Sequence, residues 1–359
     1  MSRSARLASV AGRVLWRLVN TYSPTGGEEA GVRVFLEEAE RLGLDAWTDG
    51  VGNAYAAPRR QGGRPLYGLV GHIDTIDDWF EPSIEGDSIR GRGAVDAKGP
   101  LASMLAAAAA VAEADPGAPL VVAALVGEEG DSRGARGLAA SGRVPLNVVI
   151  GEPTGGDRVV IAYRGQAILR VECTARGGHP ASPWAGESAA DLLVEAYTAL
   201  RSLYPGASLS QPTLTPLRLE ARGPSNALPT RAEAIVDARI PPGAELGEVL
   251  SRAAAALPRG CRLEVAGPYT PPVRVSLNSP VPRALVRAAL LEGLRPRPAV
   301  KAGTSDMNVL APHAGSIAAY GPGDPSLAHT RLEEVGLAEL GLAARVYLRA
   351  YRILASRGN

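Results

Sequence analysis

The fold is clearest in the segment Leu66-Tyr67-Gly68-Leu69-Val70-Gly71-His72-Ile73-Asp74-Thr75. Its first half is short and apolar, as in a strand buried inside a sheet, and a histidine and an aspartate follow where that strand would end. A second apolar segment, 120–126, leads in the same way into a pair of glutamates. Ligands and acids gather at the carboxyl ends of strands in α/β proteins. The sequence therefore predicts that a functional site, formed by these acids and the histidine, lies at this edge of an α/β sheet.

The order of the predicted elements indicates the fold class and the domains. Strands and helices alternate from the N-terminus, which predicts an α/β fold with a mixed, mostly parallel sheet and flanking helices. Between residues 163 and 272 the pattern changes to that of an α+β segment, which is small enough for an inserted domain. We therefore expect a catalytic, metal-binding domain formed by residues 1–162 and 273–359, and an inserted domain formed by residues 163–272.

The composition is that of a globular protein, with 46% hydrophobic and 21% charged residues. A formal net charge of +1 predicts neither a nucleic-acid nor a membrane partner. The longest apolar run, 104–112, is too short to cross a bilayer. The N-terminus has the spacing of a docked amphipathic helix rather than of a transit peptide. We expect a cytoplasmic protein in which Cys173 and Cys261, far apart in the sequence, are reduced thiols.

The first candidate site residues lie close together in the sequence. His72 and Asp74 are separated by one residue at the end of a predicted strand, so their side chains face the same side. Asp74 could fix the tautomer of a metal-bound imidazole or support the surroundings of the nucleophile. Taken alone, the pair is equally consistent with a surface histidine and a turn aspartate. Asp96 lies in a glycine-rich loop before a helix, where a carboxylate can bridge two cations.

Further acids follow the later strands. Glu128 and Glu129 are adjacent after the strand at 120–126, and their repulsion is costly unless cations or a shared proton relieve it. Taken alone, such a pair is more often a solvated turn. Glu152 follows another apolar strand, and His329 lies in a loop unsuited to a core histidine. Together, two imidazoles and three carboxylates would give each of two Zn²⁺-like ions three protein ligands and leave a shared position for water.

The order of these residues resembles that of the di-zinc amidohydrolase/peptidase family of acetylornithine deacetylase, succinyl-diaminopimelate desuccinylase, aminoacylase and glutamate carboxypeptidase. The resemblance covers nearly the whole chain and implies a sheet of the zinc-peptidase type. It also implies that the inserted domain serves as a lid and dimerisation module, so that the protein forms a homodimer. A further implication is a cis peptide bond between Asp96 and Ala97.

The resemblance implies how the metal ligands are shared. One zinc ion would be held by His72, Asp96 and Glu152. The other would be held by Asp96, Glu129 and His329, so that Asp96 bridges the two ions. Co²⁺ is the alternative metal.

The resemblance also implies the catalytic and substrate-binding roles. Glu128 would be the general base, and Asp74 would stand behind His72. His179 would reach the active site of a neighbouring subunit and stabilise the oxyanion. The residues implied to bind substrate are Asn226, Arg239, Gly303, Thr304 and Asp306. Arginine suits a substrate carboxylate because its planar fork pairs bidentately with it.

Two loops indicate a subgroup of the family. Gly303-Thr304-Ser305-Asp306-Met307-Asn308 and Tyr320-Gly321-Pro322-Gly323-Asp324 look most like hydrolases that release lysine or ornithine from an acidic LysW-type amino-group carrier protein. Arg239 would then hold the product carboxylate, and Asp306 its distant ammonium. Acetylornithine deacetylase and succinyl-diaminopimelate desuccinylase are the alternative enzymes. A catalytically silent binding or dimerisation module is the alternative of another class, although a binding module would not need Glu128 beside the metals.

Overall fold

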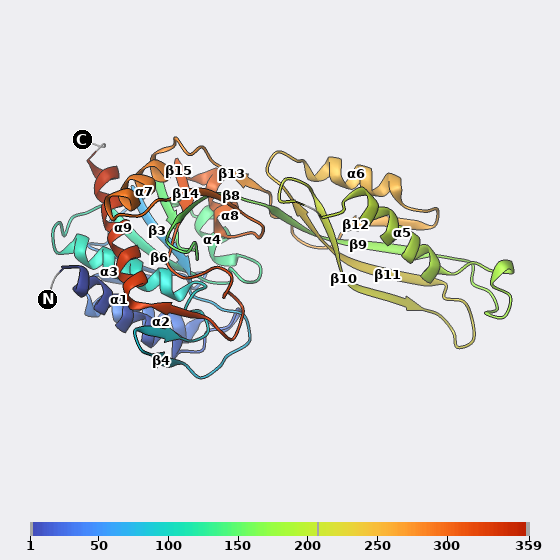
Figure 1. Cartoon of the computed structure of the whole chain (residues 1–359), viewed down its shortest axis with the longest axis horizontal. Helices are drawn as coiled ribbons and strands as arrows, with labels where there is room; N and C mark the ends of the chain where they lie inside the picture. The colour runs from blue at the N-terminus through green and yellow to red at the C-terminus, as the bar shows by residue number, and fades with distance from the viewer. Residues whose placement is uncertain (1–2, 207, 357–359) are drawn as a thin grey trace. The chain divides into compact units, whose positions relative to one another are not determined.

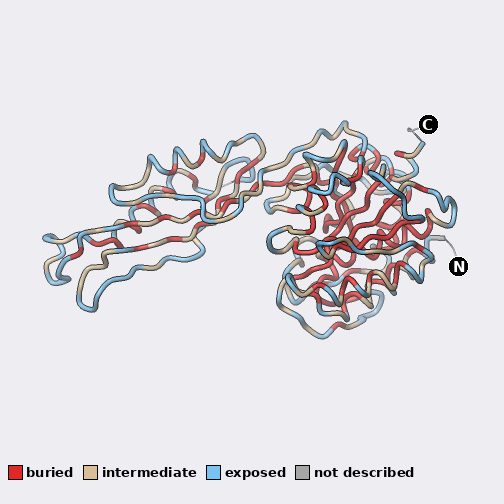
Figure 2. Tube along the Cα trace, turned by 180° about the vertical axis from the view of Figure 1, so that it is seen from behind, coloured by how far each residue is buried: buried red, intermediate tan, exposed pale blue. Residues whose placement is uncertain are grey.

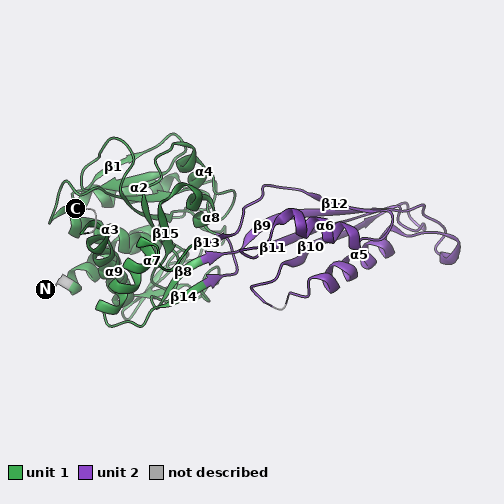
Figure 3. Cartoon of the chain, turned by 90° about the horizontal axis from the view of Figure 1, so that it is seen from above, with its two compact units in different colours: residues 1–161, 275–299, 305–359 green, residues 162–274, 300–304 purple. Residues whose placement is uncertain are grey.

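The computed structural model describes residues 3–206 and 208–356. Internal contacts divide the chain into two compact units, which Figure 3 shows in different colours. Unit 1 comprises Met1–Ile161, Val275–Ala299 and Ser305–Asn359, and unit 2 comprises Ala162–Arg274 and Val300–Thr304. No helix among the described residues has the length and apolar character that crossing a membrane requires.

The main sheet of unit 1 has the order β1-β2-β6-β3-β7-β15-β8. Its four central strands, β6, β3, β7 and β15, are mutually parallel, whereas β1, β2 and β8 are antiparallel to their neighbours. The bounds are β1 Asp45–Thr48, β2 Ala54–Ala57, β3 Tyr67–His72, β6 Leu120–Leu125, β7 Asn147–Ile150, β15 Ser316–Ala319 and β8 Arg158–Tyr163. Two further strands, β13 (Val273–Arg274) and β14 (Arg297–Lys301), pair with β8. A mixed sheet with a parallel centre confirms the predicted fold class.

Helices cover this sheet (Figure 1). Helix α3 packs against β3 and β6, α7 against β7 and β15, and α9 against α1, α3 and α7. The alanine-rich α3 is buried along almost its whole length, because its small side chains let neighbouring elements approach closely. The N-terminal helix α1 buries its apolar stripe in the same core, which confirms the predicted docked helix (Figure 2). The bounds are α1 Arg3–Val19, α2 Glu29–Arg41, α3 Lys98–Ala112, α7 Pro280–Leu291 and α9 Leu337–Ala355.

Several short elements of unit 1 carry too little sequence signal to be predicted. A three-stranded sheet has the order β16-β5-β4. Its strands are β4 Ser83–Glu85, β5 Ser88–Arg90 and β16 Glu334–Gly336. Two short helices, α4 (Arg133–Ala140) and α8 (Asp306–Leu310), pack against each other. These elements frame the loops that carry Asp96, Glu129 and His329.

Unit 2 is a four-stranded antiparallel sheet with two helices on one face. The strand order is β10-β11-β9-β12. Side chains of β9 and β11 alternate between buried and partly buried, so one face meets helices α5 and α6 and the other carries charges. The bounds are β9 Gly165–Thr174, α5 Ala189–Leu203, β10 Thr213–Arg222, β11 Arg231–Ile240, α6 Leu246–Ala256 and β12 Cys261–Val265.

The prediction of two reduced thiols is wrong for this structure. Cys173 and Cys261 form a disulfide. The cause is the register of the sheet, because the two residues lie directly opposite each other where β9 pairs antiparallel with β12. Their separation of 88 residues in the sequence gave no sign of this pairing.

The disulfide fastens the edge strand β12 to the centre of the unit 2 sheet, so its loss is expected to destabilise that unit. A bond that closes a long loop typically contributes about 2–5 kcal/mol, chiefly by restricting the unfolded chain. We expect the double variant Cys173→Ser/Cys261→Ser to lower the thermal midpoint of unit 2, measured by calorimetry. Reduction of the wild type should have the same effect, and reductant should leave the variant unchanged. Equal midpoints for the oxidised wild type and the variant would contradict this prediction.

Candidate metal centre

The site begins where the parallel strands of unit 1 end. His72 is the last residue of β3, Glu128 and Glu129 follow β6, and Glu152 follows β7. The chain beyond β15 continues through a turn-rich segment to His329. Because parallel strands point the same way, their carboxyl ends meet at one edge of the sheet. Segments far apart in the sequence are thereby brought to one edge.

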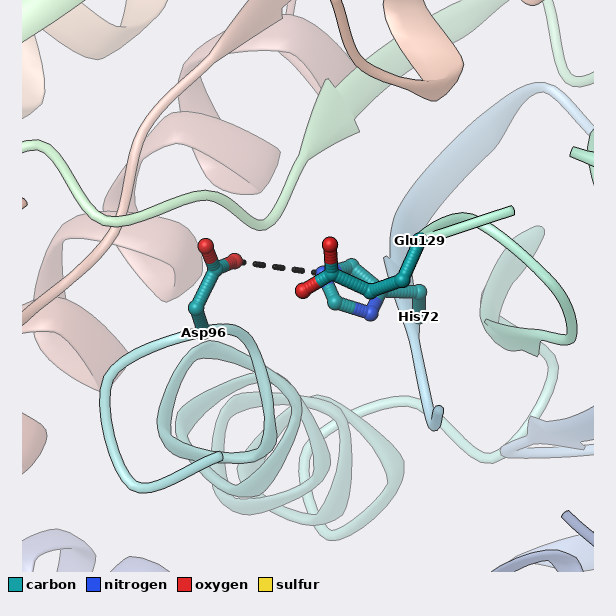
Figure 4. A group of neighbouring side chains, drawn as sticks. All are labelled: His72, Asp96 and Glu129. Atoms are coloured by element: carbon teal, nitrogen blue, oxygen red, sulfur yellow. Dashed lines mark hydrogen bonds and ion pairs between the residues drawn. The ribbon is translucent and has the colours of Figure 1, made fainter. Parts of the chain in front are cut away.

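Three side chains form the centre of the site (Figure 4). One ligand atom from each of His72, Asp96 and Glu129 lies within 4.8 Å of the others, a spacing that suits a metal ion. Asp96 Oδ1 lies 3.2 Å from His72 Nε2. The Asp96–Ala97 peptide bond is cis, as the resemblance implied. Imidazole nitrogen and carboxylate oxygen are ligands that Zn²⁺ accepts.

His329 and Glu128 border this group of three. His329 Nε2 lies 2.8 Å from Glu129 Oε1 and 3.7 Å from Asp96 Oδ2. Glu128 Oε2 lies 3.9 Å from His72 Nε2, and its side chain is largely buried. The structure therefore brings His72, Glu129 and His329 close to Asp96, and it places Glu128 beside His72.

Glu152 belongs to the same region but not to the group of three around His72, as far as the described residues show. It is buried directly after β7, with 6% of its surface exposed. Its negative charge contributes to raising the pKa values of Glu128 and Asp306.

Asp74 organises the site with both its backbone and its carboxylate. Its carbonyl oxygen lies 3.0 Å from His72 Nδ1, and if that nitrogen carries the imidazole proton, Nε2 is free as a ligand. Its two carboxylate oxygens accept the backbone N–H groups of Glu128 and Glu129, each at 3.1 Å. The hydroxyl of Thr25 donates to the same carboxylate at 2.8 Å. Asp74 thus joins the β3 and β6 loops, and Thr25, which sequence reasoning missed, supports it.

The electrostatics of the site favour bound cations. Burial raises the pKa of Glu128 well above its usual value, and the charges of Glu152, Asp306 and Glu129 add to that effect. Burial would lower the pKa of His72, but Asp74 and Asp96 outweigh it and raise the pKa well above its usual value. The hydrogen bond with Glu129 raises the pKa of His329. An excess of buried carboxylates is the condition that divalent cations relieve, so this set of donors fits a metal centre.

Asp306 is a buried acid at the start of α8. Only 2% of its surface is exposed, and its Oδ1 atom has no hydrogen-bond partner among the described residues. Burial raises its pKa to about 8, with further contributions from the charges of Asp74 and Glu152. A buried polar atom without a partner is costly, so Asp306 is suited to receive a positively charged or hydrogen-donating ligand.

Five of the predicted residues belong to unit 2 and are described within it, Arg239 last. His179 is exposed, and its Nδ1 atom accepts the backbone N–H of Ala181 at 3.1 Å. Nδ1 is then unprotonated, so Nε2 carries the proton and can act as a donor. Asn226 is exposed and has a φ of 56°. The space beside Gly303 is open, and Thr304 is half-buried.

Arg239 lies in a polar cluster on β11. Its Nε atom donates to Asp237 Oδ1 at 2.7 Å. Gln166 donates to the other carboxylate oxygen of Asp237. Arg164 donates to the carbonyl of Arg239 at 2.8 Å. The guanidinium of Arg239 is therefore held from its Nε side, and this leaves its two terminal nitrogens for a carboxylate ligand.

Residues 68–352 match the model of peptidase family M20/M25/M40. The chain belongs to this family. It shares 31% identity with the LysW-lysine/LysW-ornithine hydrolase of Saccharolobus islandicus strain L.S.2.15, over 95% of this chain and 94% of that protein. A relative from Aeropyrum pernix, whose name gives the same activity provisionally, is 40% identical over 99% of both chains.

Two solved peptidase structures share the fold. A tripeptidase from Staphylococcus aureus is similar with a TM-score of 0.84 at 19% identity, over 97% of this chain and 99% of that chain. An M20 family metallo-carboxypeptidase from Sulfolobus solfataricus is similar with a TM-score of 0.73 at 18% identity, over 96% and 99%. As a member of the M20/M25/M40 family, the chain is a metal-dependent hydrolase of amide bonds.

Proposed function

We propose that this M20/M25/M40 hydrolase cleaves the amide bond that joins lysine or ornithine to an acidic amino-group carrier protein. The observation that carries the proposal is the identity of 31–40%, over nearly the full chain, with relatives named as LysW-lysine/LysW-ornithine hydrolases. The site supports it, because the buried acids and histidines at the sheet edge suit metal-assisted hydrolysis of an amide. We also propose a cytoplasmic location.

The centre holds two divalent ions in this proposal, with Zn²⁺ as the first candidate and Co²⁺ as the second. His72, Asp96 and Glu152 hold one ion, and Asp96, Glu129 and His329 hold the other. The position of Asp96 supports a bridging role, since its two oxygens face different histidines, His72 and His329. When bound, the ions supply Lewis-acid activation of water and of the substrate carbonyl.

The catalytic work of the chain falls to three side chains. Glu128 takes the proton of the attacking water and then passes it to the leaving amine. Its role is supported by its burial, which raises the pKa of its carboxyl well above the usual value. The carboxylate of Asp74 accepts the backbone N–H of Glu128 and so keeps the Glu128 loop close to His72. His179 of the partner subunit donates a hydrogen bond to the oxyanion, and the donor state of its Nε2 atom supports this.

In this proposal, charged side chains recognise the carboxylate and the ammonium of the carrier-linked diamino acid. Arg239 pairs with the free α-carboxylate of the product moiety, and Asn226, Gly303 and Thr304 bind the rest of it. Asp306 binds the distant ammonium of lysine or ornithine, and its support is the buried Oδ1 atom without a partner. Unit 2 acts as the lid and dimerisation module, and the active enzyme is a homodimer.

A comparison of initial rates tests the proposed substrate. The metal-loaded enzyme is incubated with carrier-linked lysine, carrier-linked ornithine, acetylornithine and succinyl-diaminopimelate, and the release of free product is measured. We expect both carrier-linked substrates to be cleaved at a higher kcat/KM than either small acyl substrate.

The same rates show how the proposal would fail. Faster cleavage of acetylornithine or of succinyl-diaminopimelate would show that the substrate is a small acyl compound rather than a carrier protein. No cleavage of any of the four would favour a catalytically silent binding module. Loss of all activity on treatment with a chelator, and its return with Zn²⁺ or Co²⁺, serves as the control for the metal.

A further inference from the structure

Two buried side chains outside the ligand set connect the loops of the metal centre. Glu333 lies immediately before β16, and Arg92 follows β5 by two residues. The pairing of β16 with β5 places the two residues side by side. They form an ion pair in which the side chains are only 1% and 2% exposed. A charge pair this deeply buried is costly to assemble, which suggests that it does more than add stability.

The carboxylate of Glu333 holds the backbone of the Asp96 loop with one oxygen. Oε2 accepts the N–H groups of Gly93 at 2.9 Å, Val95 at 3.3 Å and Asp96 itself at 3.5 Å. The same loop is tightly packed, because a Cβ atom on Gly93 would lie 2.9 Å from side-chain atoms of Lys98 and Thr75. The position of the bridging carboxylate therefore depends on Glu333.

The other oxygen of Glu333 holds the His329 loop. Oε1 accepts the N–H of His329 at 3.2 Å. His329 has a φ of 64°, a conformation that side-chain-bearing residues adopt at a cost. The hydrogen bond to Glu333 keeps its backbone in this conformation and so sets where the imidazole points.

Arg92 extends the connection to the loop after β3. Its Nη1 atom donates to Glu333 Oε1 and to the carbonyl of Thr330 at 3.0 Å. Its Nε and Nη2 atoms donate to the carbonyl and the carboxylate of Asp78, at 2.8 and 2.9 Å. One guanidinium thus joins the loops that follow β3 and β5 to the loop before β16.

We propose that Glu333 and Arg92 are positioning residues that fix the spacing between Asp96 and His329, and so create the high-affinity site for the second metal ion. This inference rests on the two-ion centre proposed above. The ion held by Asp96, Glu129 and His329 depends on both loops that Glu333 joins. The ion held by His72, Asp96 and Glu152 depends on only one of them, so the two ions respond differently to loss of Glu333.

The substitution Glu333→Gln isolates this role. All the groups around the carboxylate are donors, namely the N–H groups of Gly93, Val95, Asp96 and His329 and the guanidinium of Arg92. A glutamine has one acceptor oxygen and one NH₂ group. With its oxygen turned to the three N–H groups of the Asp96 loop, it keeps that loop in place and loses the bonds to His329 and Arg92. Glu333→Asp, which keeps the charge but is one methylene shorter, is the second variant if Glu333→Gln does not fold.

The measurement is Zn²⁺ binding to the full chain without substrate, by calorimetric titration and by metal content after gel filtration. We expect wild type to bind two ions, and Glu333→Gln to keep the first while the Kd of the second rises about 10- to 100-fold, as for other residues that orient metal ligands. The matched control is Glu292→Gln, which changes another acid paired with two arginines in unit 1, Arg345 and Arg349; its side chain is 9% exposed. This control should bind both ions as wild type does.

Three results would overturn the inference: unchanged binding of both ions by a folded Glu333→Gln or Glu333→Asp, equal weakening of both ions, or the same loss in Glu292→Gln. Each of these would reduce Glu333 to an ordinary structural role. Binding of only one ion by wild type would instead contradict the two-ion centre. Because the Zn²⁺ titration contains no substrate, a wrong substrate assignment does not change its result. A failure of the positioning role can therefore be distinguished from a failure of the proposed function.

Discussion

Glu128→Gln is expected to keep its fold and both metal ions but to lose roughly 100- to 10,000-fold in kcat, the range that a general base contributes. Glutamine has the same shape but cannot take a proton from water. The backbone N–H of residue 128 still donates to Asp74, so the loop stays in place. The measurements are kcat on carrier-linked lysine and the metal content of the purified variant.

The neighbouring residue supplies a matched control for this substitution. Glu129 lies 2.8 Å from His329 and belongs to the group of three around His72. Glu129→Gln should therefore lose metal as well as activity, and excess Zn²⁺ should restore part of its turnover. Wild-type turnover of Glu128→Gln would exclude it as the base, and loss of metal in this variant would make it a ligand instead.

His179→Ala is expected to lower kcat about 100- to 1,000-fold, the cost of removing one donor to an oxyanion. The variant should bind metal normally, because His179 lies in unit 2 and outside the proposed ligand set. Mixing it with Glu128→Gln should recover activity that neither variant has alone. If subunits mix at random, half the dimers are mixed and one of their two sites is complete, so about a quarter of wild-type activity returns.

An exposed histidine elsewhere provides the control for His179→Ala. His313 is exposed in unit 1, and its backbone carbonyl, rather than its ring, accepts a hydrogen bond from Arg64. His313→Ala should retain full activity. Mixed dimers of His179→Ala and Glu128→Gln that form but stay inactive would contradict a role across the subunit interface.

The position of the site, at the carboxyl edge of the sheet, could be predicted from sequence because it depends on local sequence patterns. Apolar strands that end in acids or histidine, as at His72 and at Glu128, place those side chains at one edge once the central strands are parallel. The order of the site residues then pointed to the family, which residues 68–352 confirm. The roles of individual residues stay predictions.

What sequence reasoning missed depends on strand register and on contacts between distant segments. Cys173 and Cys261 pair because the register of β12 against β9 places them directly opposite each other. Thr25 contacts Asp74, 49 residues away in the sequence. Glu333 contacts the Asp96 loop across about 240 residues. A buried glutamate and an arginine in turn-rich segments look like surface charges, and only the fold removes them from water.

The intact mass of the carrier protein tests the central claim most directly. Lysine-loaded carrier is incubated with metal-loaded wild type, with chelated wild type and with Glu128→Gln, and its mass is followed with time. We predict that only metal-loaded wild type rapidly lowers the mass of the carrier by that of one lysine residue. Free lysine should appear in an equimolar amount. An unchanged carrier mass with the metal-loaded enzyme, or equal release after chelation, would contradict the account.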